Sequence, residues 1–383
     1  MHKLGLIIAT LMVALCALLP AQAQEFDTKA PFAILMDYES GTVLFNKNGD
    51  EPLEPASMAK LMTLAVVFDL LQTKKLQPTD EFFISEHAWR DGGAKSGGST
   101  MFAELGSQIP VMDLVRSVII QSGNDAAIAL AEGIAGTEVV FAQMMNKLGQ
   151  EIGLTNSNFV NATGLPDPDQ YSTARDLATI ARFIIAQFPE YYPIFSEKEF
   201  TWNKIRQMNR NSLLEVGIGV DGLKTGHTEA SGYGEVVSTA AGGRRLIGVL
   251  HGLKSMSERT EEARKLITWG TRGFELVPVF AAGQEVRRVP VYGGSEPDVA
   301  VVGKGAIDLF LPKGATNCPQ ADVVYNAPIR PPVRKGDQLA LLVVKCNDKV
   351  VQQTPLYAGA DVEQGDIIRQ ATDALKELAL GWL

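Results

Sequence analysis

Histidine and cysteine are scarce in this chain, which has four histidines and three cysteines. His87, His227 and His251 lie outside the extreme N-terminus, and none of them forms an HExxH pair. A zinc peptidase of that type places two histidines one helical turn apart, with a glutamate as general base between them. The sequence therefore disfavours a metallopeptidase, and we expect neither a metal nor another cofactor at the functional site.

An excess of basic residues is also missing. Lysine and arginine together number 35 against 44 acidic residues, so the formal net charge is -9. Proteins that bind nucleic acid carry concentrated positive charge for the phosphate backbone. No nucleic-acid partner is expected.

The N-terminus carries an apolar stretch over residues 4–19. This stretch is short for a membrane span, and it is followed by the small-residue triplet Ala21-Gln22-Ala23, which is typical of a cleavage site. Residues 1–23 are therefore predicted to be a signal peptide, and we expect an exported protein at the periplasmic face of the cytoplasmic membrane. Lipid attachment at Cys16 is disfavoured, because Leu15 stands where a lipoprotein signal needs a small residue.

Removal of this leader would leave Cys318 and Cys346 as the cysteines of the mature protein. An exported compartment permits them to form a disulfide, but the sequence leaves open whether they pair. The mature length of about 360 residues exceeds one typical hydrophobic core. We expect a catalytic domain over residues 24–276, a second domain over 277–362 and a terminal helix over 363–383.

The first domain is predicted to be α+β, a mixed sheet with helical cover. Strand patterns occupy residues 33–38, 43–47, 232–240 and 244–250. Helical patterns begin near Ala56 and Ser57, cover 111–120 and 126–134, and follow the capping box of Ser255 and Glu258. Asn124 and Asp125 are predicted to cap the helix over 126–134.

The second domain is predicted to be small and all-β. Short apolar runs at 299–302, 307–311 and 339–344 alternate with turns rich in glycine, proline and asparagine.

The terminal segment returns to helical spacing. One side of it is apolar and the other charged; the apolar residues are Ile367, Ile368, Ala371, Leu375, Leu378 and Trp382. Such a stripe usually packs on its parent domain. Because it follows an apparently complete domain, we expect it instead to lie in a bilayer interface.

Ser57-Met58-Ala59-Lys60 places a hydroxyl and an amine one turn apart on the same helix face. Serine needs a base to act as a nucleophile, and a buried lysine serves when its pKa is low enough for part of it to be neutral. A helix N-terminus near Ser57 also favours negative charge. Taken alone, the motif fits equally a capping serine and a surface lysine.

Two further motifs follow in the chain. Ser122-Gly123-Asn124 lies in a tight break between two helices, and Lys224-Thr225-Gly226 begins a strand region. Gly226 would let a substrate backbone approach the strand edge closely. Each motif alone fits a helix cap or an exposed turn, whereas the three in this order, each at a suitable structural position, indicate a catalytic site.

With these motifs the sequence resembles the serine penicillin-recognising enzymes, and among them the low-molecular-mass penicillin-binding proteins that act as D-alanyl-D-alanine carboxypeptidases. The resemblance covers nearly the whole mature chain. It extends to residues 97–102, 161–167 and 209–211, and to His227 after the KTG triplet.

The resemblance implies that Ser57 attacks the terminal D-Ala-D-Ala bond of a peptidoglycan stem peptide and is acylated by β-lactam antibiotics. Lys60 would take the proton of Ser57, and Ser122 would relay one to the leaving D-alanine. Backbone N–H groups of Ser57 and His227 would form the oxyanion hole. Substrate contacts are implied for Asn124, Lys224, Thr225, Gly226, His227 and Arg210.

Three alternatives share these motifs or the domain layout. A class A β-lactamase needs a deacylating glutamate between SxN and KTG, whereas the region around Asp167 and Asp169 has no recognisable glutamate motif. A D,D-endopeptidase would use the same acyl transfer and differ in how it admits the substrate. A non-catalytic wall-binding scaffold has no need of intact Ser57, Lys60 and Lys224.

Overall fold

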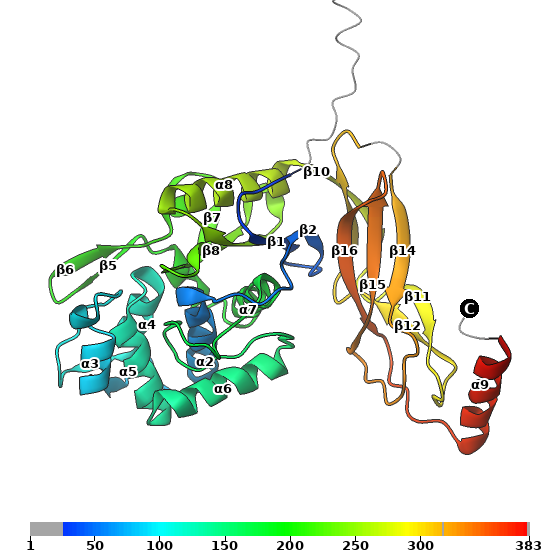
Figure 1. The fold of residues 1–383 in the computed structure, drawn as a ribbon, viewed down its shortest axis with the longest axis horizontal. Coiled ribbons are helices and arrows are strands. Elements are labelled where there is room, and N and C mark those ends of the chain that lie inside the picture. The colour runs from blue at the N-terminus through cyan, green and yellow to red at the C-terminus, as the bar shows by residue number, and fades with distance from the viewer. Residues whose placement is uncertain (1–25, 316–317, 381–383) are drawn as a thin grey trace, which may run out of the picture. The chain divides into compact units, whose positions relative to one another are not determined.

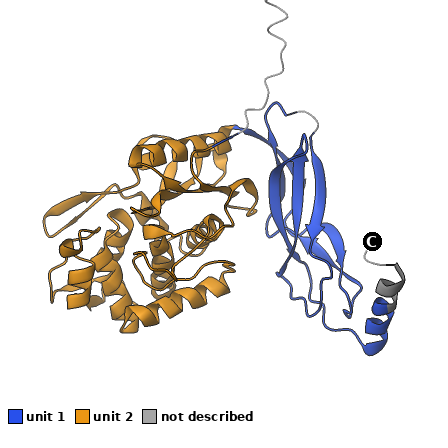
Figure 2. Cartoon of the chain, in the orientation of Figure 1, with its two compact units in different colours: residues 1–27, 273–383 blue, residues 28–272 orange. Residues whose placement is uncertain are grey.

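The computed structural model describes residues 26–315 and 318–380, which divide into two compact units (Figure 2). Unit 2 comprises residues 28–272, and unit 1 contains the described residues from 273 onward together with those before residue 28. The predicted signal peptide, residues 1–23, lies outside the described residues.

Unit 2 is built on a five-stranded sheet in the order β2-β1-β9-β8-β7 (Figure 1). Each neighbouring pair is antiparallel, so the sheet is not the mixed one expected. The reason is that hairpin turns join β1 to β2 and β7 through β9, and β9 then lies antiparallel to β1. The strands are β1 (Phe32–Asp37), β2 (Val43–Lys47), β7 (Val220–Thr228), β8 (Gly232–Thr239) and β9 (Leu246–Leu253).

Helices cover both faces of this sheet, as predicted. Along β9, Ile247 and Val249 join the main core together with residues of α2 (Lys60–Gln72) and α7 (Ala174–Gln187). Successive strand residues point to opposite faces, and Gly248 faces Leu266 of α8 (Met256–Arg272). The sheet is thus enclosed between α7 with α2 on one side and α8 on the other.

Helix α2 is buried over most of its length, as its apolar sequence predicts. It packs against α5, α6 and α7. The other helices of unit 2 are α3 (Glu86–Asp91), α4 (Val111–Ile120), α5 (Asn124–Ala135) and α6 (Glu138–Glu151), with short 3₁₀ turns η1 (Ala56–Ala59), η2 (Ala94–Ser96), η3 (Tyr192–Ser196), η4 (Ser212–Glu215) and η5 (Ala241–Gly243). Two small hairpins pair β3 (Glu81–Phe83) with β4 (Gln108–Pro110) and β5 (Glu199–Trp202) with β6 (Ile205–Met208).

Unit 1 is an antiparallel β-domain that ends in a helix, as the sequence predicts. Its core is made of valine, leucine and isoleucine side chains that alternate along the strands. Cys318 and Cys346 form a disulfide, which settles the pairing left open by the sequence. The elements are β10 (Phe274–Phe280), β11 (Glu285–Pro290), β12 (Asp298–Val302), β13 (Ile307–Pro312), β14 (Gln320–Tyr325), β15 (Gln338–Cys346), β16 (Lys349–Ala358) and α9 (Ile367–Leu380).

Within the described residues, no helix by itself is long and apolar enough to cross a membrane. Two consecutive helices, α5 and α6, meet that criterion only when taken together, and they meet at an angle of 85°.

An aromatic cluster around Phe68 provides a test of the core of unit 2. Phe68 is fully buried in α2, and its ring contacts those of Phe188, Tyr191 and Phe195. Phe68→Ala should lower the free energy of unfolding by about 3–5 kcal/mol in urea denaturation, because it removes a large side chain from a packed core. Phe83→Ala, at a half-exposed site, is the matched control and should cost less than about 1 kcal/mol. Equal effects of the two changes would contradict this assignment of the core.

Candidate active site

Ser57 lies in the 3₁₀ turn η1, directly before α2. The sequence predicted that the α-helix itself begins at residues 56–57, whereas the structure begins it at Lys60. Ala56, the first residue of η1, has a left-handed backbone with φ of 47°, which excludes it from a regular α-helix. The turn therefore sets Ser57 apart from the helix while keeping it one turn from Lys60.

The amine of Lys60 is enclosed by three oxygen atoms from different parts of the chain. Lys60 Nζ lies 3.0 Å from Ser57 Oγ and 2.7 Å from Asn124 Oδ1, and it also donates to the carbonyl of Thr163. The whole residue is buried. These contacts point the amine at the hydroxyl of Ser57.

Burial, the largest cause, and the positive charge of Arg210 together lower the pKa of Lys60 to about 7, although the carboxylates of Glu138 and Asp125 act in the opposite direction. An amine with a pKa near 7 is neutral in part of the molecules at neutral pH. The environment thus gives Lys60 the property that a general base needs.

Ser122 and Asn124 lie where α4 ends and α5 begins. Ser122 has a left-handed backbone with φ of 66°, and its Oγ accepts a hydrogen bond of 2.9 Å from Lys224 Nζ. Gly123 occupies the N-cap position of α5, so the prediction that Asn124 and Asp125 cap this helix is wrong. The side chain of Asn124 is directed to Lys60 instead.

Lys224 is almost fully buried beside this loop. Its Nζ donates to Ser122 Oγ and to the carbonyl of Thr225. Burial lowers the pKa of Lys224 well below its usual range, and the charges of Lys60, Arg210 and Arg259 add to this effect. The charge of Lys60 thus disfavours the charged form of Lys224, and a nearby anion would stabilise an ammonium group at either position.

Strand β7 carries the third motif at the edge of the sheet. A Cβ atom on Gly226 would lie 3.1 Å from the carbonyl oxygen of Pro55 and 3.1 Å from Met58 Cγ, so a larger residue would require these neighbours to shift where β7 approaches the η1 turn. His227 is exposed, and its ring stacks on that of Tyr233 at 3.9 Å.

Arg210 reaches the same region from the segment after β6. Its Nε donates to the carbonyl of Gln121, next to Ser122, at 2.9 Å. Arg259 of α8 in turn donates to the carbonyl of Arg210. The structure thus brings Ser57, Lys60, Ser122, Asn124, Lys224 and Arg210 into one connected group of contacts and charges.

Sequence reasoning missed the groups that hold these residues in place. The buried carboxylate of Asp125 accepts hydrogen bonds from Thr100 Oγ1 and from the backbone N–H groups of Met101 and Ala103. It thereby attaches the 99–103 segment to the start of α5. Its position next to the SxN motif was visible in the sequence, but its partners belong to a distant segment.

The backbone carbonyl of Thr163 was also missed, because no side chain identifies it. Asn161 Oδ1 accepts from Thr163 N and from Gly164 N, which shapes the loop. A Cβ atom on Gly164, whose φ is 76°, would lie 1.9 Å from the carbonyl oxygen of Ala56. A glycine is therefore required where this loop meets the turn that carries Ser57.

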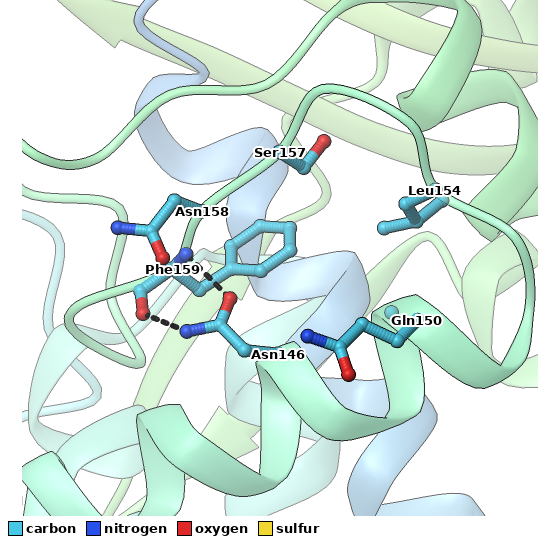
Figure 3. A pocket seen from close by; sticks show the side chains of 7 residues that line it. Asn146, Gln150, Leu154, Ser157, Asn158 and Phe159 are labelled. Carbon is cyan, nitrogen blue, oxygen red and sulfur yellow. Dashed lines mark hydrogen bonds between the residues drawn. The ribbon is translucent and has the colours of Figure 1, made fainter.

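A hollow of about 330 Å³ lies elsewhere, between α6 and the 157–159 segment (Figure 3). Its lining includes none of the predicted site residues. The residues are Asn146, Gly149, Gln150, Leu154, Ser157, Asn158 and Phe159.

Comparison with known proteins gives matches over most of the chain. Residues 20–255 match the model of the D-alanyl-D-alanine carboxypeptidase family. Residues 274–364 match the model of the C-terminal domain of penicillin-binding protein 5. D-alanyl-D-alanine carboxypeptidase DacC of Escherichia coli is 40% identical over 355 residues, which are 92% of this chain and 88% of that protein. DacA of Haemophilus influenzae is 40% identical over 89% of this chain and 87% of its own length.

Solved structures of penicillin-binding proteins agree with these sequence matches. Penicillin-binding protein 5 from Haemophilus influenzae has a TM-score of 0.70 at 40% identity, covering 89% of this chain and 99% of that one. Penicillin-binding protein D2 from Listeria monocytogenes, solved in an ampicillin-bound form, has a TM-score of 0.57 at 26% identity over 65% of this chain and 99% of its own. The α+β fold with its β-domain and the predicted family are thereby confirmed, and the chain belongs to the D-alanyl-D-alanine carboxypeptidases, a family of serine peptidases among the penicillin-binding proteins.

Proposed function

We propose that Ser57 is the nucleophile that removes the terminal D-alanine from peptidoglycan stem peptides. Its Oγ attacks the carbonyl carbon of the penultimate D-alanine while its proton passes to the neutral amine of Lys60. The C–N bond then breaks, the leaving amine receives a proton, and water hydrolyses the acyl-enzyme to regenerate Ser57 and a shortened peptide. The observation that carries this proposal is the 3.0 Å approach of Lys60 Nζ to Ser57 Oγ inside a buried site.

Ser122 is suited to deliver the proton to the leaving amine. It belongs to the same connected group as Lys60, and its hydroxyl is already hydrogen-bonded to Lys224. A hydroxyl can accept one proton while it donates another, so it can relay a proton without remaining charged. Asn124 supports both steps, because its Oδ1 holds Lys60 and leaves the amide nitrogen to meet a substrate carbonyl.

The positive charges around Lys224 favour a substrate with a free carboxylate. Lys224 and Arg210 would meet the terminal carboxylate, and Thr225 would orient it through its hydroxyl. The edge strand β7 would receive the peptide backbone, as strand edges do in many peptide complexes, with Gly226 allowing close approach. Backbone N–H groups of Ser57 and His227 would stabilise the oxyanion.

The comparisons bear differently on the three alternative functions. The matching relatives are carboxypeptidases and penicillin-binding proteins, which does not favour a β-lactamase or a non-catalytic scaffold. An endopeptidase on the same scaffold shares every step above, and assays on cross-linked peptides distinguish it.

We also propose that the protein is exported by its N-terminal leader and associates with the membrane through α9. Ile367 and Ile368 of α9 are 83% and 77% exposed. The polar side of the helix instead contacts the β-domain, because Asp373 accepts a hydrogen bond from Gly293 N. Two exposed isoleucines at the start of this helix suit insertion into a bilayer interface.

The role of Ser57 predicts a covalent adduct. Wild-type protein incubated with a β-lactam should gain the mass of one inhibitor molecule, and Ser57→Ala should gain none because it lacks the attacking oxygen. The same variant should release no D-alanine from diacetyl-Lys-D-Ala-D-Ala, a loss of at least about 10³-fold. An adduct on Ser57→Ala would remove Ser57 from the mechanism.

The lowered pKa of Lys60 predicts the pH dependence of acylation. Only the neutral amine accepts a proton, so the acylation rate should rise with pH through about 7 and then level off. Lys60→Arg should lose about 10²–10⁴-fold in rate at every pH, because arginine does not deprotonate. Lys224→Arg keeps the charge and should retain part of the rate. Wild-type rates in Lys60→Arg, measured by stopped-flow fluorescence, would contradict the assignment.

The exposed side of α9 predicts where the protein partitions. Removing residues 367–383 should move it from the membrane pellet to the soluble fraction and leave D-alanine release from a soluble peptide unchanged. Ile367→Asn with Ile368→Asn should weaken membrane binding without removing the helix. Binding should survive high salt, because apolar contact rather than charge supports it. A truncated protein that still pellets, or that unfolds, would show that α9 belongs to the fold.

A further inference from the structure

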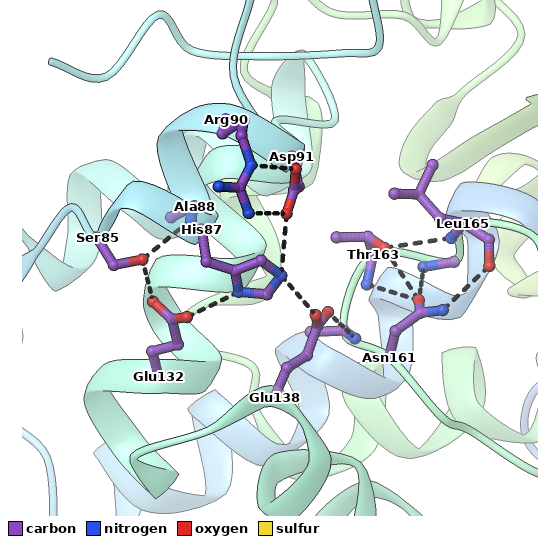
Figure 4. Close-up of polar contacts among 12 residues, drawn as sticks. Ser85, His87, Ala88, Arg90, Asp91, Glu132, Glu138, Asn161, Thr163 and Leu165 are labelled. Atoms are coloured by element: carbon purple, nitrogen blue, oxygen red, sulfur yellow. Dashed lines mark hydrogen bonds and ion pairs between the residues drawn. The ribbon is translucent and has the colours of Figure 1, made fainter. Parts of the chain in front are cut away.

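A polar cluster beside the start of α6 surrounds a half-exposed imidazole (Figure 4). His87 of α3 has its Nδ1 2.8 Å from Glu132 Oε1. Its Nε2 lies 3.7 Å from Asp91 Oδ2 and 3.9 Å from Glu138 Oε2. Three carboxylates from three helices thus face the His87 ring. Of these three, Glu138 also contacts the backbone inside the protein.

The second carboxylate oxygen of Glu138 is connected to the amine of Lys60 through the backbone of Ala162 and Thr163. Glu138 Oε1 accepts a hydrogen bond of 2.8 Å from Ala162 N. The carbonyl of Ala162 accepts from Thr63 Oγ1 of α2 at 2.7 Å, and the next carbonyl, that of Thr163, accepts from Lys60 Nζ. One carboxylate therefore fixes the short backbone segment that orients Lys60.

Charge links the two residues as well. The carboxylate of Glu138 raises the pKa of Lys60 against the effect of burial, and the charge of Lys60 lowers the pKa of Glu138, which burial raises. The charge of His87 also lowers the pKa of Glu138, and that of Glu132 raises it. The other charged groups that face Lys60 are Arg210, Asp125 and Lys224.

We propose that Glu138, oriented by His87, is a positioning residue for Lys60: it fixes the Ala162–Thr163 backbone that aims the amine and supplies a negative charge behind it. Glu138 does not touch the reacting atoms and acts through the loop. This role rests on the proposed function, in which Lys60 is the base. It extends the site from the three motifs to a cluster that reaches solvent at His87.

The test compares Glu138→Gln, Glu138→Ala and His87→Gln with wild type. The measurement is the rate constant for acylation by a fluorescent β-lactam from about pH 5 to about pH 10. Glu151→Gln is the matched control, because it removes the same charge from the other, exposed end of α6. Thermal unfolding of each variant shows whether it is folded.

Glu138→Gln keeps an oxygen that accepts from Ala162 N but loses the charge. Its high-pH rate should stay within about threefold of wild type, while the midpoint of its acid limb should fall by about half a pH unit or more, because the ammonium form of Lys60 loses a stabilising charge. His87→Gln should shift the midpoint in the same direction by less. Glu138→Ala also loses the hydrogen bond, and its high-pH rate should fall by about tenfold.

A Glu138→Gln profile that superimposes on those of wild type and Glu151→Gln would overturn the proposal. A high-pH rate of Glu138→Ala equal to that of Glu138→Gln would overturn the positioning of the backbone, and an unchanged His87→Gln profile would overturn the part given to His87. If Glu138→Ala does not fold, the Glu138→Gln profile decides. Failure of the wild type to be acylated at any pH would contradict the proposed function instead.

Discussion

The burial of one amine is the constraint on which the catalytic unit depends. Lys60 is fully buried and shielded from bulk solvent, so protein atoms must meet its hydrogens. Acceptors come from the turn before α2, the start of α5 and the loop at Thr163. These segments are far apart in the sequence, and the fold has to bring them within hydrogen-bond distance of a single nitrogen. The close contact of Gly164 with Ala56 is one local result of that convergence.

The side chains that the structure brings together around Lys60 were visible in the sequence, because their types are unusual at their positions. A serine and a lysine one turn apart, a polar break between helices and a glycine on a strand each stand out against an apolar core. The sheet and its helical cover were also predictable from strand and helix periodicity. The pairing of β9 with β1 was not, because periodicity gives the faces of a strand and not its distant neighbours.

The supporting groups escaped prediction for a different reason. Thr163 contributes a backbone carbonyl, which every residue has, and Glu138 acts through a partner 24 residues away. Asn124 had a plausible local role as a helix cap, yet its side chain is used for Lys60. At Asn124, the tertiary contact with Lys60 therefore replaces the expected helix cap. In unit 1 the same limit applied to Cys318 and Cys346, because their pairing depends on how the segment before β14 lies against β15.

Two buried lysines have a thermodynamic consequence for how this site takes up a ligand. Burial and neighbouring cations disfavour the charged form of Lys224. A bound carboxylate reverses that preference, since an adjacent anion stabilises an ammonium group. If Lys224 meets the substrate carboxylate as proposed, capture of a peptide C-terminus would be coupled to the uptake of protons from solution, and the heat of binding would depend on the ionisation enthalpy of the buffer. A ligand with an amidated C-terminus would lack this coupling, so the proposed site would discriminate by protonation as well as by shape.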